Sequence, residues 1–174
     1  TEENNRLYIK AATDAEYEIL MSSRVEYQWE FSLGGDYQDW KPDGDAVLDS
    51  VQDGSVVIYS PAGKDPKIAI ATDFKAEECT KIEIGVKYDE SLASMSPELF
   101  FATTAESTYS TDKVFQFSWA DATVENGIAK ITIIPSTNEK FVETITSLRF
   151  DPFATAGQIE LDYIRCTIVP AEEE

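Results

Sequence analysis

The chain has 174 residues, of which 33 are acidic and 14 basic, so its formal net charge is −19. A surface this acidic repels nucleic acid and anionic membranes, and we expect neither as a partner. Histidine is absent, which excludes Ser-His-Asp and Cys-His nucleophiles and the usual zinc sites. Hydrophobic residues make up 43% of the sequence, enough for a sizeable core, so we expect one monomeric domain over residues 1–174.

The two ends of the chain are polar and acidic. The sequence starts with TEENN and finishes with PAEEE, compositions that are typical of linkers between domains. No apolar run approaches the ~20 residues of a membrane span, and no signal peptide is recognisable. We therefore expect a module of a longer, exported protein.

Alternation of apolar and polar residues with a period of two marks short strands in the first half of the chain. The expected strands are residues 7–11, 17–21, 25–32, 47–51, 55–60, 67–71 and 81–88. The turn Asp53-Gly54 predicts a hairpin between two of them. Residues 33–45 read as a long loop, and residues 74–80 could hold one helical turn.

The second half continues the same pattern and ends in an expected hairpin. Its strands are residues 98–105, 114–120 and 129–134, followed by the hairpin over residues 146–169. In that hairpin Pro152 stops the first strand, and the second strand puts Ile159, Leu161, Tyr163 and Arg165 on one face. No segment is suited to a helix that crosses between parallel strands. The pattern predicts an all-β, antiparallel, two-sheet β-sandwich of the jelly-roll type.

The final segment also carries a resemblance to a known family. Its pattern LR-x-DP … G-x-x-x-x-DYIR resembles the C-terminal hairpin of jelly-roll carbohydrate-binding modules, the galactose-binding-like β-sandwiches of secreted glycoside hydrolases and bacterial surface proteins. Further landmarks follow in the same order: WEF at 29–31, GDYQDW at 35–40, DGSVV at 53–57, KDPKI at 64–68, LFFATT at 99–104, TDKVFQF at 111–117 and TSLRFDP at 146–152. Together they cover about residues 29–168. The resemblance implies a polysaccharide partner but does not specify the glycan.

A sandwich buries one face of each sheet, so the opposite face is free to bind a ligand. The residues opposite the apolar sets of four strands are Lys87, Phe100, Gln116 and Arg149. If these strands adjoin, one sheet face carries all four, and Gly85 leaves space beside them. In the resembling modules the concave sheet is the ligand face. The alternative is a solvated face on which Lys87 and Arg149 pair with Glu83 and Asp151 in weak surface salt bridges.

Aromatic side chains supply platforms for sugar rings, whose C–H faces are apolar. Tyr37, Trp40 and Tyr109 lie in expected loops and could wall a cleft. The alternative for Trp40 is to close one end of the sandwich. We assign Trp29, Trp119 and Phe141 to the core.

The resemblance also implies a structural calcium ion near the last strand, bound by carboxylate oxygens and backbone carbonyls. Asp162 is the first side-chain candidate for this ion and Glu30 the next. The two cysteines, Cys79 and Cys166, are too few for a disulfide scaffold. They form one disulfide if their strands are antiparallel neighbours, or they are two separate small core residues.

The function that the resemblance implies is non-catalytic binding of a plant-type polysaccharide. The ligand would be a β-glucan or a hemicellulose such as xyloglucan or xylan, and binding would tether a parent enzyme or surface protein to it. Three alternatives stay open: a structural or interaction domain without a glycan ligand, an α-glucan (starch) binder, and a small glycoside hydrolase. A hydrolase needs two facing carboxylates, and the paired-glutamate pattern E-x-D-x-x-E is absent from the sequence.

Overall fold

The computed structural model of the chain describes residues 24–31, 36–52, 54–60, 65–153 and 157–169. The strands expected at 7–11 and 17–21, and both acidic ends, lie outside the described residues. Where the chain is described, its only helices are four short 3₁₀ turns: η1 (Ala76–Glu78), η2 (Glu90–Ser94), η3 (Trp119–Asp121) and η4 (Pro135–Thr137). None of them is long and apolar enough to cross a membrane. The helical turn expected within residues 74–80 is η1.

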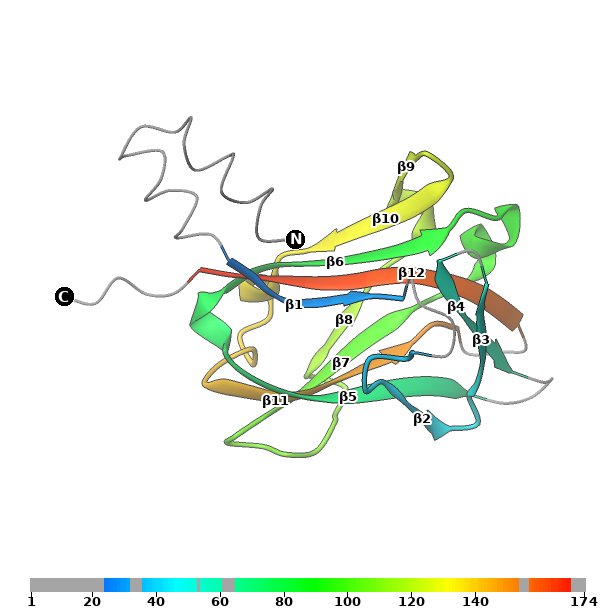
Figure 1. Cartoon of the computed structure of the whole chain (residues 1–174). Coiled ribbons are helices and arrows are strands. Elements are labelled where there is room, and N and C mark those ends of the chain that lie inside the picture. The colour runs from blue at the N-terminus through cyan, green and yellow to red at the C-terminus, as the bar shows by residue number, and fades with distance from the viewer. Residues whose placement is uncertain (1–23, 32–35, 53, 61–64, 154–156, 170–174) are drawn as a thin grey trace, which may run out of the picture.

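Twelve strands in the described ranges form two antiparallel sheets that face each other (Figure 1). The seven-stranded sheet has the order β3 (Val47–Gln52), β4 (Ser55–Ser60), β12 (Gly157–Ile168), β6 (Cys79–Lys87), β10 (Ile128–Ile133) and β9 (Thr123–Glu125), with β1 (Arg24–Glu30) also paired to β12. The five-stranded sheet has the order β2 (Lys41–Gly44), β5 (Pro66–Lys75), β11 (Thr144–Asp151), β7 (Glu98–Thr103) and β8 (Val114–Gln116). The predicted all-β sandwich is confirmed.

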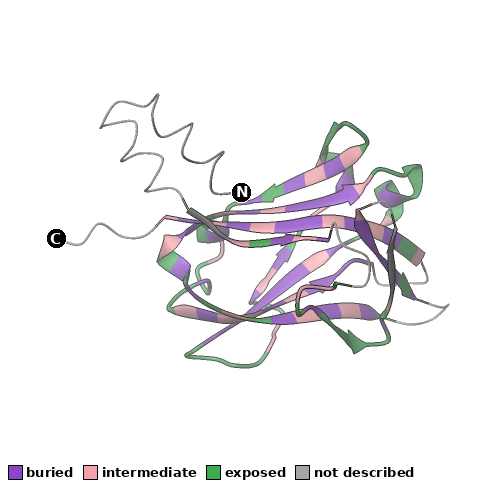
Figure 2. Cartoon of the chain, in the orientation of Figure 1, coloured by how far each residue is buried: buried purple, intermediate pink, exposed green. Residues whose placement is uncertain are grey.

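The core lies between the two sheets, where alternate residues of strands such as β5 and β10 are buried (Figure 2). Leu148 and Phe150 of β11 and Leu99 of β7 are fully buried on this inner side, which the period of two predicts. The assignment of Trp29, Trp119 and Phe141 to the core is confirmed. Trp119 reaches the core from η3, because β8 ends at Gln116, four residues before the end of the expected strand.

The expected C-terminal hairpin is wrong. Strands β11 and β12 belong to opposite sheets, so they do not pair with each other as a hairpin. β11 pairs with β5 and β7, whereas β12 pairs with β4, β6 and β1. The last segment therefore ties the two sheets together.

A β-bulge also changes the faces of the last strand. The register between β12 and β6 shifts between Leu161 and Tyr163, and the extra residue of a bulge reverses the alternation beyond it. Ile159 and Leu161 face the core before the bulge, and Ile164 faces it afterwards. Tyr163 and Arg165 therefore do not share the face of Ile159 and Leu161 as the alternation predicted.

Candidate functional site

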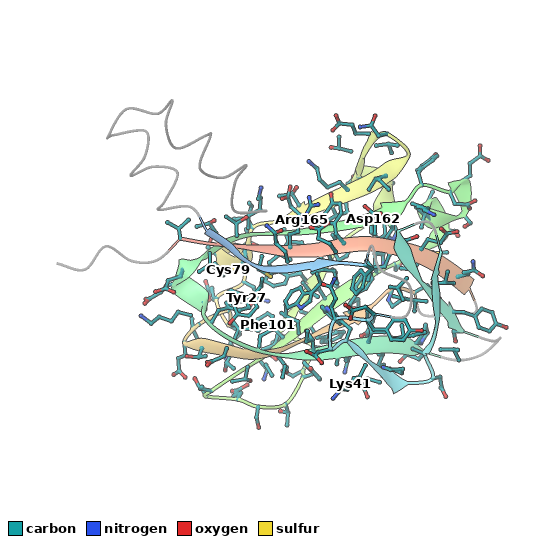
Figure 3. All side chains as sticks on the ribbon, viewed as in Figure 1. Tyr27, Lys41, Cys79, Phe101, Asp162 and Arg165 are labelled. Carbon is teal, nitrogen blue, oxygen red and sulfur yellow. The ribbon has the colours of Figure 1, made fainter. Side chains whose placement is uncertain are left out.

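The outer face of the five-stranded sheet carries three of the four residues that strand alternation placed together. Phe100 of β7 lies opposite Arg149 of β11, and Gln116 of β8 lies opposite Glu98 of β7. One row of opposed residues runs across all five strands: Lys41, Ala69, Arg149, Phe100 and Val114. Figure 3 shows Lys41 at the bottom of the view, on the side of this sheet away from the other sheet, whereas Phe101 lies between the sheets.

Arg149 is the centre of this face. Its guanidinium donates from Nε to Oδ1 of Asp151 at 2.8 Å and from Nη2 to Oδ2 at 2.9 Å. Its Cζ lies 4.1 Å from the centroid of the Phe100 ring and 4.7 Å from that of Tyr109, both within cation–π range. The Arg149 side chain is only 14% exposed. The arrangement is therefore a sheltered, bidentate ion pair stacked on aromatic rings, not the weak surface salt bridge of the alternative.

Tyr109 reaches this face from the loop between β7 and β8, which passes below the five-stranded sheet in Figure 1. Its hydroxyl donates to Oγ of Ser147 at 2.9 Å. Its ring meets that of Phe100 edge-on at 6.4 Å between centroids. Phe100 is consequently only 8% exposed, so the prediction of an exposed Phe100 platform is wrong. Tyr109, which is half-buried, is the aromatic ring that this face presents.

The loop that carries Tyr109 is closed around a buried lysine. Lys113 is 1% exposed, and its Nζ donates to the backbone oxygens of Glu106, at 2.9 Å, and Thr108. The same Nζ lies 3.3 Å from Oε2 of Glu106. Since buried charge is costly unless it is paired and hydrogen-bonded, these contacts fix the loop, and with it the position of Tyr109.

A shallow hollow of about 620 Å³ lies on the outer face beside Tyr109. Ala69 and Ala71 of β5 leave room for it, because their side chains are single methyl groups. Its other lining residues are Asp39, Lys41, Asp43, Ile70 and Ser147. The hollow thus combines apolar surface, an aromatic edge and several hydrogen-bonding groups, which is the composition of an orienting ligand site.

Burial raises the pKa of Asp151 from 3.8 to about 6, although the hydrogen bonds and charge of Arg149 lower it. Because the folded pKa exceeds the unfolded one, the contribution of this group to stability is complete below pH 3.8 and is lost as the pH rises through about 6. We expect the free energy of unfolding of the wild type, relative to Asp151→Asn, to fall by about 1–3 kcal/mol between pH 4 and pH 7. Denaturant titrations at each pH measure this difference, and a carbon NMR titration of Asp151 with a midpoint below 4 would contradict it.

Lys87 does not belong to this face. It lies on β6 of the seven-stranded sheet, on the other side of the sandwich, and its Nζ is 2.7 Å from Oε2 of Glu160. The space expected at Gly85 is also taken, because a Cβ there would lie 2.4 Å from Cε1 of Tyr163. The placement of Lys87 with the other three residues is therefore wrong, since β6 and β7 are consecutive in sequence but belong to different sheets.

Two of the three expected wall residues lie away from the hollow. Trp40 is 2% exposed and packs edge-on against Trp29 at 5.4 Å between ring centroids. It is a core residue and not a wall of a cleft. Tyr37 packs against the core and its hydroxyl donates to the backbone oxygen of Leu48 at 3.5 Å.

The two metal candidates, Glu30 and Asp162, are close together but differ in whether their carboxylates are already bound. Glu30 lies on β1 opposite Tyr163, the neighbour of Asp162. Both carboxylate oxygens of Glu30 accept hydrogen bonds from Arg165, so Glu30 does not fit a cation. Burial raises the pKa of Asp162, and the nearby Glu30 raises it further. Within the described ranges, no three histidine, cysteine, aspartate or glutamate side chains come together in a way that could hold a metal ion.

Calcium binding by Asp162 stays a prediction. If this prediction is correct, EDTA lowers the melting temperature of the wild type, because an ion bound only by the native state stabilises that state. The Asp162→Asn variant then melts at the same temperature with and without EDTA. An unchanged wild-type melting temperature in EDTA would contradict the prediction.

Sequence reasoning missed several residues of this face. Lys41, Ala69 and Ser147 line the hollow. The sequence did predict Asp151 as the partner of Arg149, but in a weak surface salt bridge, whereas the pair is sheltered. Alternation along β11 places Ser147, Arg149 and Asp151 on one side of the strand, so that signal was present. The neighbours on β2 and β5 required the strand order, which the sequence pattern did not supply.

No protein-family model and no curated protein sequence matches this chain. Its fold is similar to that of a module from Roseburia intestinalis, CBM86, described as a low-affinity xylan-binding module, with a TM-score of 0.52 at 10% identity over 82% of this chain and 94% of that chain. The chain has the fold of a carbohydrate-binding module. It is also similar to a variant of CBM29-2 complexed with mannohexaose, with a TM-score of 0.56 at 10% identity over 80% of this chain and 89% of that chain. A second variant, complexed with cellulohexaose, has a TM-score of 0.55 at 10% identity over 81% of this chain and 90% of that chain. The resemblance drawn from the sequence is confirmed for the fold.

Proposed function

We propose that this chain is a non-catalytic module that binds a plant-type polysaccharide, a β-glucan or a hemicellulose, on the outer face of the five-stranded sheet. The observation that carries the proposal is the hollow beside Tyr109, whose aromatic edge lies next to the Arg149–Asp151 ion pair. The solved modules with this fold include ones described with xylan, mannohexaose and cellulohexaose. Their ligands support a neutral glycan chain as the ligand of this module.

The chemistry of the face suits sugar hydroxyls and ring faces. Half-buried Tyr109 offers an apolar edge, and Lys41, Asp39 and Asp43 offer exposed donors and acceptors around the hollow. Arg149 is already bound to Asp151 and stacked on Phe100, so its position does not have to be ordered when a ligand arrives. Preorganisation of this kind lowers the entropic cost of binding.

Affinity gel electrophoresis against a panel of soluble polysaccharides tests the proposal. The panel contains xylan, xyloglucan, mannan, mixed-linkage β-glucan and soluble starch, with bovine serum albumin as the non-binding control. We expect retardation by at least one of the first four and no release of reducing sugar from any of them. Retardation by starch alone would favour an α-glucan binder. No retardation by any polysaccharide of the panel would favour a structural domain. Reducing sugar above a blank would show a hydrolase.

Tyr109→Ala should weaken polysaccharide binding by about tenfold, because a stacked aromatic ring contributes on the order of 1–2 kcal/mol. The matched control is Tyr59→Ala, which removes a tyrosine that is 44% exposed on β4 of the other sheet. Isothermal titration calorimetry of both variants measures the two affinities. Equal affinities in Tyr109→Ala and Tyr59→Ala would remove Tyr109 from the site.

A further inference from the structure

The two cysteines of the chain lie on neighbouring strands of the seven-stranded sheet. Cys79 begins β6 and lies opposite Ile168 of β12, while Cys166 of β12 lies opposite Ile82 of β6. The register between these strands shifts at this point, between Thr167 and Ile168, so Cys79 and Cys166 form a diagonal pair. Diagonal residues on one face of an antiparallel pair are neighbours across the two strands.

Both cysteines belong to the same buried core cluster. Cys79 is 4% exposed and Cys166 is 0% exposed. The thiol of Cys79 donates to the backbone oxygen of Lys81, with 3.8 Å between Sγ and that oxygen. Figure 3 shows Cys79 where β6 starts, beside the C-terminal end of β12. The sequence contains no other cysteine, so neither thiol has a competing partner within the chain.

We propose that Cys79 and Cys166 form an intrachain disulfide when the chain folds in an oxidising medium. The oxidant is a small-molecule disulfide of the glutathione type. The thiolate of one cysteine attacks it and releases one reduced thiol, and the second cysteine then displaces the other thiol from the mixed disulfide. The two cysteine hydrogens end on the two released thiols, and the chain loses two electrons to the oxidant.

This bond must form during folding rather than afterwards. In the folded chain the neighbouring Cys79 and burial raise the pKa of the Cys166 thiol well above its usual value, which keeps it in the unreactive thiol form. Both sulfur atoms are also shielded from an external disulfide by their burial. Once formed, the bond would link the start of β6 to the C-terminal end of β12. It would close a loop that runs from residue 79 to residue 166.

The test uses the whole chain, refolded from denaturant in a buffer of oxidised and reduced glutathione. The product is unfolded again and treated with iodoacetamide, and its mass is measured by mass spectrometry. We expect a mass about 2 Da below that of the reduced chain and no alkylation. Because a disulfide that closes a loop of this length constrains the unfolded state strongly, reduction should lower the melting temperature by roughly 10 °C.

A variant separates the bond from a general effect of reductant. Cys166→Ala should melt at the same temperature with and without dithiothreitol. Two alkylated cysteines in the refolded wild type, or a stable glutathione adduct on one of them, would overturn the proposal. These outcomes do not depend on carbohydrate binding, which the gel panel measures separately.

Discussion

Arg149→Ala should lower the free energy of unfolding by about 3–5 kcal/mol at pH 7, because it leaves the buried carboxylate of Asp151 without its partner. The guanidinium also covers the ring of Phe100 and contacts the ring of Tyr109, so its removal uncovers the first ring and takes one contact from the second. We therefore expect polysaccharide binding to be lost as well. Denaturant unfolding measures the first effect and calorimetric titration with a binding polysaccharide measures the second.

The pH separates this mechanism from a general packing defect. Arg149 lowers the pKa of Asp151, so Asp151 should take up a proton at higher pH in Arg149→Ala than in the wild type. A protonated carboxyl is much cheaper to bury than a charged one. The loss of stability should thus be smaller at pH 5 than at pH 7. A loss that is equal at both values would show that packing, not the unpaired charge, is responsible.

Lys113→Met should have the next largest effect, a loss of about 2–3 kcal/mol in the free energy of unfolding. Methionine has a similar length but no hydrogen-bond donor, so the oxygens of Glu106 and Thr108 lose the partner that they share in the folded chain. The loop should then lose its fixed shape, and Tyr109 should leave Ser147 and Arg149. Since Lys113 does not line the hollow, any loss of binding would act through Tyr109.

The control for this variant is Lys140→Met, which replaces an exposed lysine in the loop before β11. It removes the same charge and should change stability by less than about 0.5 kcal/mol. Calorimetric titration at a temperature where both variants are folded compares their affinities. If Lys113→Met binds as tightly as Lys140→Met, the shape of the loop does not govern the site.

Alternation along single strands predicted much of the fold and part of the site. The core positions Leu148, Phe150 and Leu99, and the outward direction of Phe100 and Arg149, follow from the period of two within one strand. These statements need no knowledge of neighbouring strands. The two-sheet sandwich follows in the same way, because many short amphipathic strands without crossover helices have few other ways to bury one face.

Statements about which strands adjoin were less successful. Lys87 and Arg149 have the same local pattern, and only the strand order places them on opposite sides of the sandwich. Pro152 ends a strand equally well before a hairpin turn and before a crossing to the other sheet. The cover over Phe100 comes from Tyr109, whose loop is fixed by Lys113. A lysine in a polar loop has no sequence signal that distinguishes it from a solvated one.

The central claim is that a polysaccharide chain binds the outer face of the five-stranded sheet, and NMR titration tests it most directly. The ligand is an oligosaccharide of the glycan that retards the protein most in the gel panel. We expect the largest shifts at the backbone amides of Ala69, Ala71, Tyr109 and Ser147, with no change at Arg165 on the opposite sheet. Shifts that gather around Arg165, or that leave the hollow unaffected while the ligand binds, would contradict the account.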